Sequence, residues 1–259
     1  MAVLLDRACL RAFGRDAIGF AQSMLSNDVE ALTPGQGVYA LLLTPKARVV
    51  SDMEVYRVGD ELVLACPPDT RDAVAETLVR SRFRKKVEFE PIPLVEVWGD
   101  GDGALAALDT PAGRLALTEA APADPRPLTE WEVARVEAGL PRFGVDFDDT
   151  MMPAEAGVVD RAVSFTKGCY PGQEPVARLR YRGHANRGLR GVRLSAEPPT
   201  AGAPVALGER QVGRLGSMVV SPRLGLIGLA VLRREVDDGQ PVDVGGVAGV
   251  VSPLPFPEA

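Results

Sequence analysis

The eight residues Lys167–Glu174 read KGCYPGQE and place a thiol, a phenol, an amide and charges of both signs in one short segment. Gly168 and Gly172 flank its centre, which predicts a tight turn of the backbone. Such a turn directs the thiol of Cys169 towards the surface. The segment therefore predicts a functional loop with Cys169 at its centre, and the alternative is a cysteine that merely packs in a strand-to-helix turn.

Charges around this cysteine favour a reactive thiol. Nearby positive charge is supplied by Lys167, Arg178, Arg180 and Arg182. Positive charge beside a cysteine stabilises the thiolate, which is the nucleophilic form. Gln173 and Glu174 offer an amide and a carboxylate that can bind a polar ligand or hold the loop in place.

The composition of the whole chain limits the classes of function. It has 259 residues and a net charge of −6, and at roughly 150 residues per domain this predicts one large domain or two unequal ones. The single histidine, His184, excludes a multi-histidine metal site, and three cysteines are too few for a four-cysteine cluster. We therefore expect no metal site. The acidic balance argues against a DNA-binding protein but leaves a local basic patch possible.

The sequence also predicts a compartment. No stretch approaches the roughly 18 consecutive apolar residues that a membrane span needs, and the N-terminal apolar run is too short for a signal peptide. Cys9, Cys66 and Cys169 show no disulfide spacing. We therefore expect a cytoplasmic protein without a membrane partner.

The apolar pattern predicts a mixture of helices and strands that changes character towards the C-terminus. We expect helices at 10–32, 69–84, 104–108 and 129–138, and strands at 38–43, 49–58, 61–65, 87–90 and 94–98. From Leu189 onward, short strands alternate with glycine and proline and predict a small antiparallel barrel or sandwich. A proline-rich segment, 195–203, predicts the linker. The expected domains are 1–197 and 198–259.

The octapeptide KGCYPGQE resembles the signature of the YgfZ family, which belongs to the superfamily of the glycine-cleavage T-protein, a folate-dependent aminomethyltransferase. Other segments resemble that superfamily in the same order along the chain: LSNDV at 25–29, VVSDMEVYRV at 49–58, RVEAGL at 135–140 and PAEAG at 153–157. The resemblance covers nearly the whole chain. It implies an α+β fold, with a folate-binding body of antiparallel sheets and helices followed by a small C-terminal β-barrel.

The same resemblance implies roles for individual residues. Glu137 matches the glutamate that binds the pterin of tetrahydrofolate, and a carboxylate can accept two parallel hydrogen bonds from its 2-amino-pyrimidinone edge. Asp52 matches an aspartate near the reacting carbon and, with Cys169, is a candidate catalytic residue. Ser51 stands where T-proteins usually carry a second acid, which puts aminomethyl transfer in doubt. Further candidates for folate contacts are Phe143, Lys167, Gln173, Glu174 and Arg187.

The function implied is that of a tetrahydrofolate-binding accessory protein for the assembly or repair of iron–sulfur enzymes, including enzymes that modify tRNA. Its partners would be folate and iron–sulfur enzymes or assembly factors. One alternative is an enzyme, a folate-dependent aminomethyl or one-carbon transferase. A second is a pure interaction module without a small ligand. A third is direct binding of tRNA through the basic run 178–193.

Overall fold

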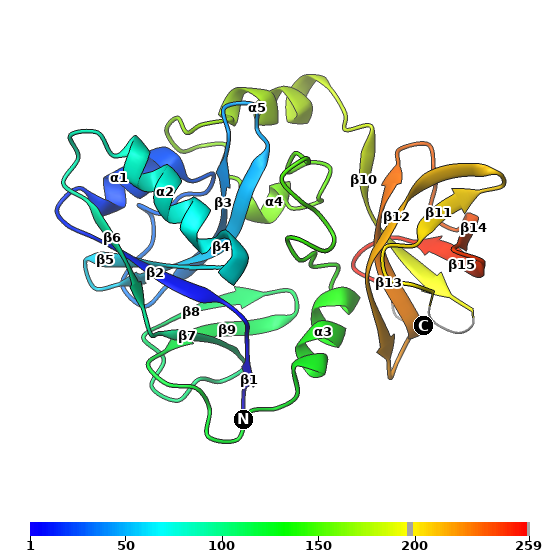
Figure 1. The fold of residues 1–259 in the computed structure, drawn as a ribbon, viewed down its shortest axis with the longest axis horizontal. Coiled ribbons are helices and arrows are strands. Elements are labelled where there is room, and N and C mark those ends of the chain that lie inside the picture. The colour runs from blue at the N-terminus through cyan, green and yellow to red at the C-terminus, as the bar shows by residue number, and fades with distance from the viewer. Residues whose placement is uncertain (196–198, 258–259) are drawn as a thin grey trace. The chain divides into compact units, whose positions relative to one another are not determined.

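The computed structural model describes residues 1–195 and 199–257 (Figure 1). The chain forms two compact units. The first consists of Met1–Leu128 with Val159–Ala177, and the second of Thr129–Val158 with Arg178–Ala259. Each unit therefore contains two separate stretches of the chain.

Two antiparallel sheets build the first unit. One has the strand order β3-β4-β5-β2-β6, with β3 at Gly37–Leu43, β4 at Val49–Val58, β5 at Glu61–Cys66, β2 at Ala8–Phe13 and β6 at Glu88–Ile92. The other has the order β1-β7-β9-β8, with β1 at Val3–Leu4, β7 at Val95–Trp98, β9 at Gly113–Thr118 and β8 at Ala106–Thr110.

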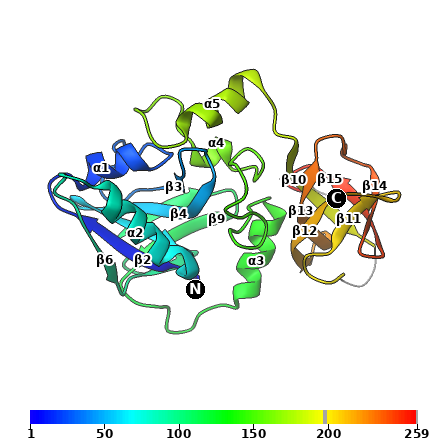
Figure 2. The same ribbon diagram turned by 45° about the horizontal axis from the view of Figure 1, so that its top comes forward.

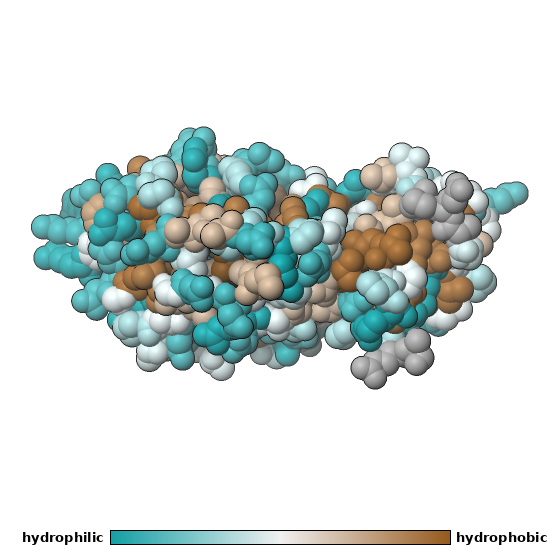
Figure 3. All heavy atoms as spheres, turned by 90° about the horizontal axis from the view of Figure 1, so that it is seen from below, coloured by the Kyte–Doolittle hydropathy of each residue, from teal (hydrophilic) through white to brown (hydrophobic). Residues whose placement is uncertain are grey.

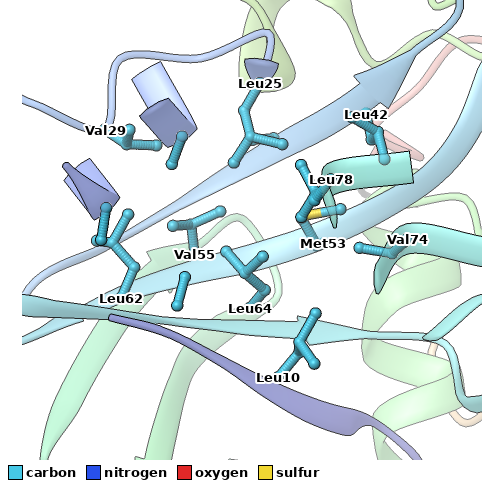
Figure 4. Packing of buried hydrophobic residues seen from close by; sticks show 14 of the residues in the cluster. Leu10, Leu25, Val29, Leu42, Met53, Val55, Leu62, Leu64, Val74 and Leu78 are labelled. Atoms are coloured by element: carbon cyan, nitrogen blue, oxygen red, sulfur yellow. The ribbon is translucent and has the colours of Figure 1, made fainter. Parts of the chain in front are cut away.

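Strand β4 separates an apolar layer from a polar one. Helices α1 (Ala17–Met24) and α2 (Arg71–Ser81) cover one face of the five-stranded sheet (Figures 1 and 2). Met53 and Val55 point into the core under these helices (Figure 4). Because side chains alternate along a strand, Asp52, Glu54 and Tyr56 lie on the opposite face. The buried residues of that face pack against side chains of the four-stranded sheet.

The second unit contains a closed barrel with the strand order β10-β13-β12-β11-β14-β15. The strands are β10 (Arg187–Leu194), β11 (Pro204–Leu207), β12 (Arg210–Ser221), β13 (Gly225–Arg233), β14 (Pro241–Val244) and β15 (Val247–Ser252). Its interior is filled with aliphatic side chains such as Val205, Leu215 and Val244. Helix α3 (Leu128–Glu137) lies almost entirely in this unit, α4 (Val159–Ala162) lies in the first unit, and α5 (Gln173–Arg182) contains residues of both.

The expected α+β fold with a C-terminal barrel is confirmed, whereas several local predictions are wrong. The segment 10–32 is not one helix or a helix pair, because Ala8–Phe13 forms strand β2 between β5 and β6 before α1 begins. The segment 104–108, expected as a helix, includes the first three residues of strand β8. Helix α5 was not predicted. Among the described residues, no helix is long and apolar enough to cross a membrane.

The domain boundary expected between 197 and 198 lies outside the described residues. The barrel already includes β10, which precedes that position in the chain. The proline-rich stretch therefore connects two strands of one barrel, β10 and β11. A linker-like composition between strands is indistinguishable in sequence from a linker between domains.

Candidate functional site

The KGCYPGQE loop lies in the first unit and ends where α5 begins. Gly172 has φ +84°, and a Cβ atom there would lie 2.7 Å from the carbonyl oxygen of Thr44 and 3.0 Å from Cα of Ala47. Only glycine lets the loop pack this closely on the turn between β3 and β4. Gly168 has open space around it, so the structure places no such demand on it.

Cys169 differs from the other two cysteines in its environment. Its side chain is exposed, whereas Cys9 and Cys66 are buried in adjacent strands. Burial raises the pKa of the Cys9 thiol to about 12 and that of Cys66 to about 11, which keeps both thiols protonated. The structure thus leaves Cys169 as the thiol that reaches solvent, as the turn-forming glycines predict.

The side chain of Lys167 forms hydrogen bonds with backbone carbonyls of the first unit. Its Nζ donates to the carbonyl oxygens of Gln22, Leu25 and Asn27, at 2.5 to 3.0 Å, at and beyond the end of α1. A lysine in this position satisfies carbonyls that the helix leaves without partners and complements its dipole. Burial lowers the pKa of Lys167 to about 8, although Asp28 and Glu30 oppose the shift.

The LSNDV segment holds this loop in place, a role that sequence reasoning missed. Its carbonyls accept hydrogen bonds from Lys167. It also contacts helix α4, because the Ser26 hydroxyl donates to the carbonyl of Ala162. The Asn27 side-chain amide donates to the carbonyls of Tyr39 and Arg161. Two motifs of the family resemblance, far apart in sequence, therefore form one assembly. Gln173 and Glu174 occupy the first turn of α5, with Gln173 half-buried and Glu174 exposed.

Asp52 is buried on the inner face of the first unit. One carboxylate oxygen accepts a hydrogen bond from Arg7 at 3.3 Å, and the other accepts one from the Tyr39 hydroxyl at 3.0 Å. Its neighbour Ser51 points to the other side of the sheet and contacts the Thr70 hydroxyl at 2.7 Å. The Asp52 carboxylate is thus fixed by hydrogen bonds from Arg7 and Tyr39 and does not face open solvent.

Two further carboxylates complete this cluster. Glu54, two residues along β4, lies 3.0 Å from Arg7, and Glu96 on β7 lies 3.7 Å from it. Glu96 also accepts a hydrogen bond of 2.5 Å from the Tyr56 hydroxyl. We call Arg7, Asp52, Glu54 and Glu96 the acidic cluster. It contains three acids and one base, all of them buried or half-buried.

The electrostatics of the acidic cluster favour bound protons. Burial raises the pKa of Glu54 and, more strongly, of Glu96, because the charged form loses its water. Arg7 opposes the shift in both groups and Arg161 opposes it in Glu54, but burial outweighs these positive charges. The sequence contained a signal for part of this: acids at 52 and 54 in an apolar strand share one face. Nothing in the sequence places Glu96 beside them.

Glu137 lies in the second unit, at the end of α3. Its carboxylate accepts hydrogen bonds from the Ser221 hydroxyl and from Arg223, the latter at 2.8 Å. These bonds lower its pKa although burial opposes the change, so the group is an ionised carboxylate at neutral pH. The side chain is 17% exposed, and each oxygen retains a further acceptor site.

Two other expected folate contacts also lie in the second unit. Phe143 is half-buried and meets Phe147 edge to face, with ring centroids 5.3 Å apart. Arg187 donates to Glu155 at 2.7 Å and lines a cavity of about 580 Å³ together with Arg214 and Arg233. The site residues inferred from the sequence are therefore divided: Glu137, Phe143 and Arg187 belong to the second unit, and Asp52, Lys167, Cys169, Gln173 and Glu174 to the first.

Comparison with known proteins places the fold. The structure of the glycine cleavage system aminomethyltransferase T from Bartonella henselae superimposes with a TM-score of 0.83 over 99% of this chain and 86% of that one, at 18% sequence identity. Residues 186–256 match the model of the CAF17 C-terminal beta-barrel domain. The chain therefore has the fold of the aminomethyltransferase class with a barrel of the CAF17 type.

Two curated relatives show which proteins this chain resembles in sequence. Human IBA57, a mitochondrial iron-sulfur cluster assembly factor, is 28% identical over 88% of this chain and 76% of its own length. The tRNA-modifying protein YgfZ of Yersinia enterocolitica is 27% identical over 71% of this chain and 68% of its own. The chain is thus similar to YgfZ and to IBA57 over most of its length, which confirms the resemblance inferred from the KGCYPGQE segment.

Proposed function

We propose that this protein is a tetrahydrofolate-binding accessory factor for the assembly or repair of iron–sulfur enzymes, with a cytoplasmic location. The observation that carries the proposal is the combination of an aminomethyltransferase fold over nearly the whole chain with relatives that assemble iron–sulfur clusters and modify tRNA. The clients would be iron–sulfur enzymes, including those acting on tRNA.

Folate recognition is assigned to the second unit. Glu137 fits a pterin chemically, because it is ionised and partly exposed and its oxygens can each accept one more hydrogen bond. Phe143 offers a half-buried ring for stacking, and Arg187 a guanidinium for a carboxylate tail. Tetrahydrofolate would supply a carrier for one-carbon groups.

Calorimetry with tetrahydrofolate tests this assignment. We expect the intact chain to bind and Glu137→Gln to weaken binding about tenfold or more, because the amide presents a donor where the pterin edge needs an acceptor. Glu130→Gln, on the exposed part of the same helix, is the matched control and should bind as the wild type does. Absence of binding by the wild type would refute folate recognition.

Cys169 is assigned the thiol chemistry of the accessory role. It is exposed in a loop whose position is fixed by Gly172 and Lys167. In cells that lack the native protein, we expect Cys169→Ser to fail to restore the activity of an iron–sulfur enzyme. Cys9→Ala, which removes a buried thiol, is the comparison variant and should restore it. Full rescue by Cys169→Ser would exclude the thiol from the function.

A further inference from the structure

A strongly basic turn lies in the first unit, apart from every residue assigned above. Residues Arg82–Lys86 read RFRKK and connect α2 to β6 at the left edge of Figure 1. We call this segment the RFRKK turn. Phe83, Arg84, Lys85 and Lys86 are exposed, and this edge of the unit is predominantly hydrophilic in Figure 3. The chain as a whole carries a net charge of −6, so the cluster is a local reversal of charge.

The turn is held rigidly by the backbone. The Lys85 amide donates to the carbonyl of Arg82 at 2.8 Å, and the Arg82 side chain donates to the carbonyl of Val87 at 3.0 Å. The Lys86 amide donates to the Asp16 carboxylate at 2.7 Å. A Cβ atom at Gly14 would lie only 2.5 Å from the carbonyl oxygen of Lys86, so glycine permits this contact.

The aromatic ring at the tip is displayed at a conformational cost. Phe83 has φ +47°, a region that bulky side chains rarely adopt, and its exposed fraction is 86%. Its ring packs against no core residue of the described chain, and only the Arg84 guanidinium lies over it, at 5.5 Å. Burial therefore does not explain why a phenylalanine stands there, whereas a strained and exposed residue is typical of a binding site.

The basic groups surround a concave surface. Phe13, Gly14 and Arg15 together with residues 82–88 line a cavity of about 520 Å³. The side chains of Lys85 and Lys86 have no hydrogen bond or ion pair with any residue that the structure describes. Arg15 is exposed, and its contact with Asp16 is a long one of 3.9 Å. Five cations, Arg15, Arg82, Arg84, Lys85 and Lys86, are thus gathered here.

We propose that the RFRKK turn binds single-stranded or looped RNA, with phosphates in the basic cavity and one base stacked on Phe83. Phosphate groups complement a cluster of lysines and arginines, and an unstacked base is the ligand that an isolated, exposed aromatic ring accepts. An anionic lipid surface is less well matched, because the cluster is concave and presents one large apolar ring. The inference does not depend on folate binding or on Cys169.

Fluorescence anisotropy with a labelled single-stranded RNA of about 12 nucleotides tests the proposal on the full chain. The variant Arg84→Gln/Lys85→Gln/Lys86→Gln is expected to bind about tenfold more weakly or worse. The slope of log affinity against log salt between about 50 and 200 mM should fall by about 2. The matched control, Arg178→Gln/Arg180→Gln/Arg182→Gln on α5, removes the same charge from the other basic segment and should retain most of the affinity.

Phe83→Gly separates binding from folding. Glycine tolerates φ +47°, so the variant should unfold at the same or a higher temperature, yet its affinity for RNA should fall about fivefold or more. Phe83→Trp should restore binding. The proposal is refuted if the wild type does not bind, if both triple variants lose affinity equally, or if Phe83→Gly retains full affinity. Tighter binding to vesicles of anionic lipid than to RNA would also refute it.

Discussion

Each unit of this protein surrounds an arginine with acidic side chains, but the two networks differ in charge balance. In the second unit, Arg135 lies 3.3 Å from Asp146 and donates to Glu132, and Arg142 lies 3.2 Å from the same Glu132. Two bases therefore face two acids. In the first unit, Arg7 is the one cation within ion-pair distance of Asp52, Glu54 and Glu96 among the described residues, and Arg161 acts on Glu54 from farther away.

The balanced network joins α3 to the barrel. Arg135 donates to the Ser217 hydroxyl at 2.7 Å and to the carbonyl of Leu140 at 3.1 Å. Asp146 accepts the Ser217 amide at 2.6 Å and the Arg142 amide at 2.8 Å. A Cβ atom at Gly216 would lie 2.3 Å from Asp146, so this carboxylate sits directly on the strand. Every partner is satisfied, which indicates a structural joint.

The acidic cluster is arranged for a different purpose. It brings three acids and one arginine together in a buried space, and burial, followed by repulsion from the neighbouring acids, raises the pKa values of Glu54 and Glu96. Surplus charge of this kind costs stability, and proteins that retain it usually do so at functional sites. The contrast suggests that the second network serves the fold, while the first positions Asp52 and stores protons next to it.

The largest expected effect comes from breaking the balanced network. Arg135→Met leaves Asp146 buried without its cation, and we expect the free energy of unfolding to fall by about 3–5 kcal/mol. Urea denaturation at pH 7 measures it. Arg114→Met, which removes an exposed arginine with a 3.7 Å contact to Asp109, should change stability by less than about 1 kcal/mol. A similar small loss for Arg135→Met would show that the joint is not structural.

Breaking the acidic cluster should have a smaller effect that depends on pH. In Arg7→Met the three carboxylates lose their cation, but protons can partly replace it. We expect a loss of about 2 kcal/mol at neutral pH and a smaller one at pH 5, where more of the cluster is protonated. Urea denaturation at the two pH values tests this. An equal loss at both would contradict the view that the cluster binds protons.

The sequence predicted the fold class because its evidence was spread over many residues. The run of short strands after Leu189 predicts a small antiparallel barrel or sandwich whatever its exact register, and the structure has the closed barrel of β10–β15. Local errors arose where one segment supports two structures. Ala8–Phe13 can be read as the start of a helix, and only its neighbours β5 and β6 make it a strand.

Some residues of the candidate site could be placed from the sequence, whereas others could not. Gly172 and Cys169 lie three residues apart in sequence, so turn chemistry is enough to predict a thiol at the surface. The roles of Lys167 and Arg7 depend on contacts with residues far along the chain, such as Asn27 and Glu54. No periodicity encodes such contacts. The sequence predicts that Lys167 supplies charge to the cysteine, and the resemblance implies a folate contact, whereas its ammonium binds the carbonyls at the end of α1.

The protons bound by the acidic cluster should make the stability of the wild-type protein depend on pH. The carboxyls of Glu54 and Glu96 keep protons in the folded state at pH values where the unfolded chain, with a carboxyl pKa near ~4.3, has released them. Stability from this source is complete below that pH and is lost as the pH rises through the raised values. Between pH 5 and 7, the free energy of unfolding should fall, by at most about 1.4 kcal/mol per pH unit for each proton.

Lys167 does not disturb this interval, because its pKa of about 8 keeps it protonated in both states below pH 7. Urea denaturation at several pH values between 5 and 7 measures how the free energy of unfolding changes with pH. A free energy of unfolding that rises from pH 5 to 7 would show that the cluster holds no proton in the folded protein.

The smallest expected effect is also the sharpest contrast between the networks. Glu96→Gln replaces a carboxyl whose pKa is raised by burial with a neutral group of the same shape, and the Tyr56 hydroxyl can donate to the amide oxygen. We expect stability at pH 7 to change by less than about 1 kcal/mol and its decline from pH 5 to 7 to become shallower. The same exchange in the second unit, Asp146→Asn, removes acceptors that Ser217 and Arg142 use and should cost about 1–3 kcal/mol. Two equal losses in urea denaturation would remove the distinction, because both carboxylates would then be serving the fold.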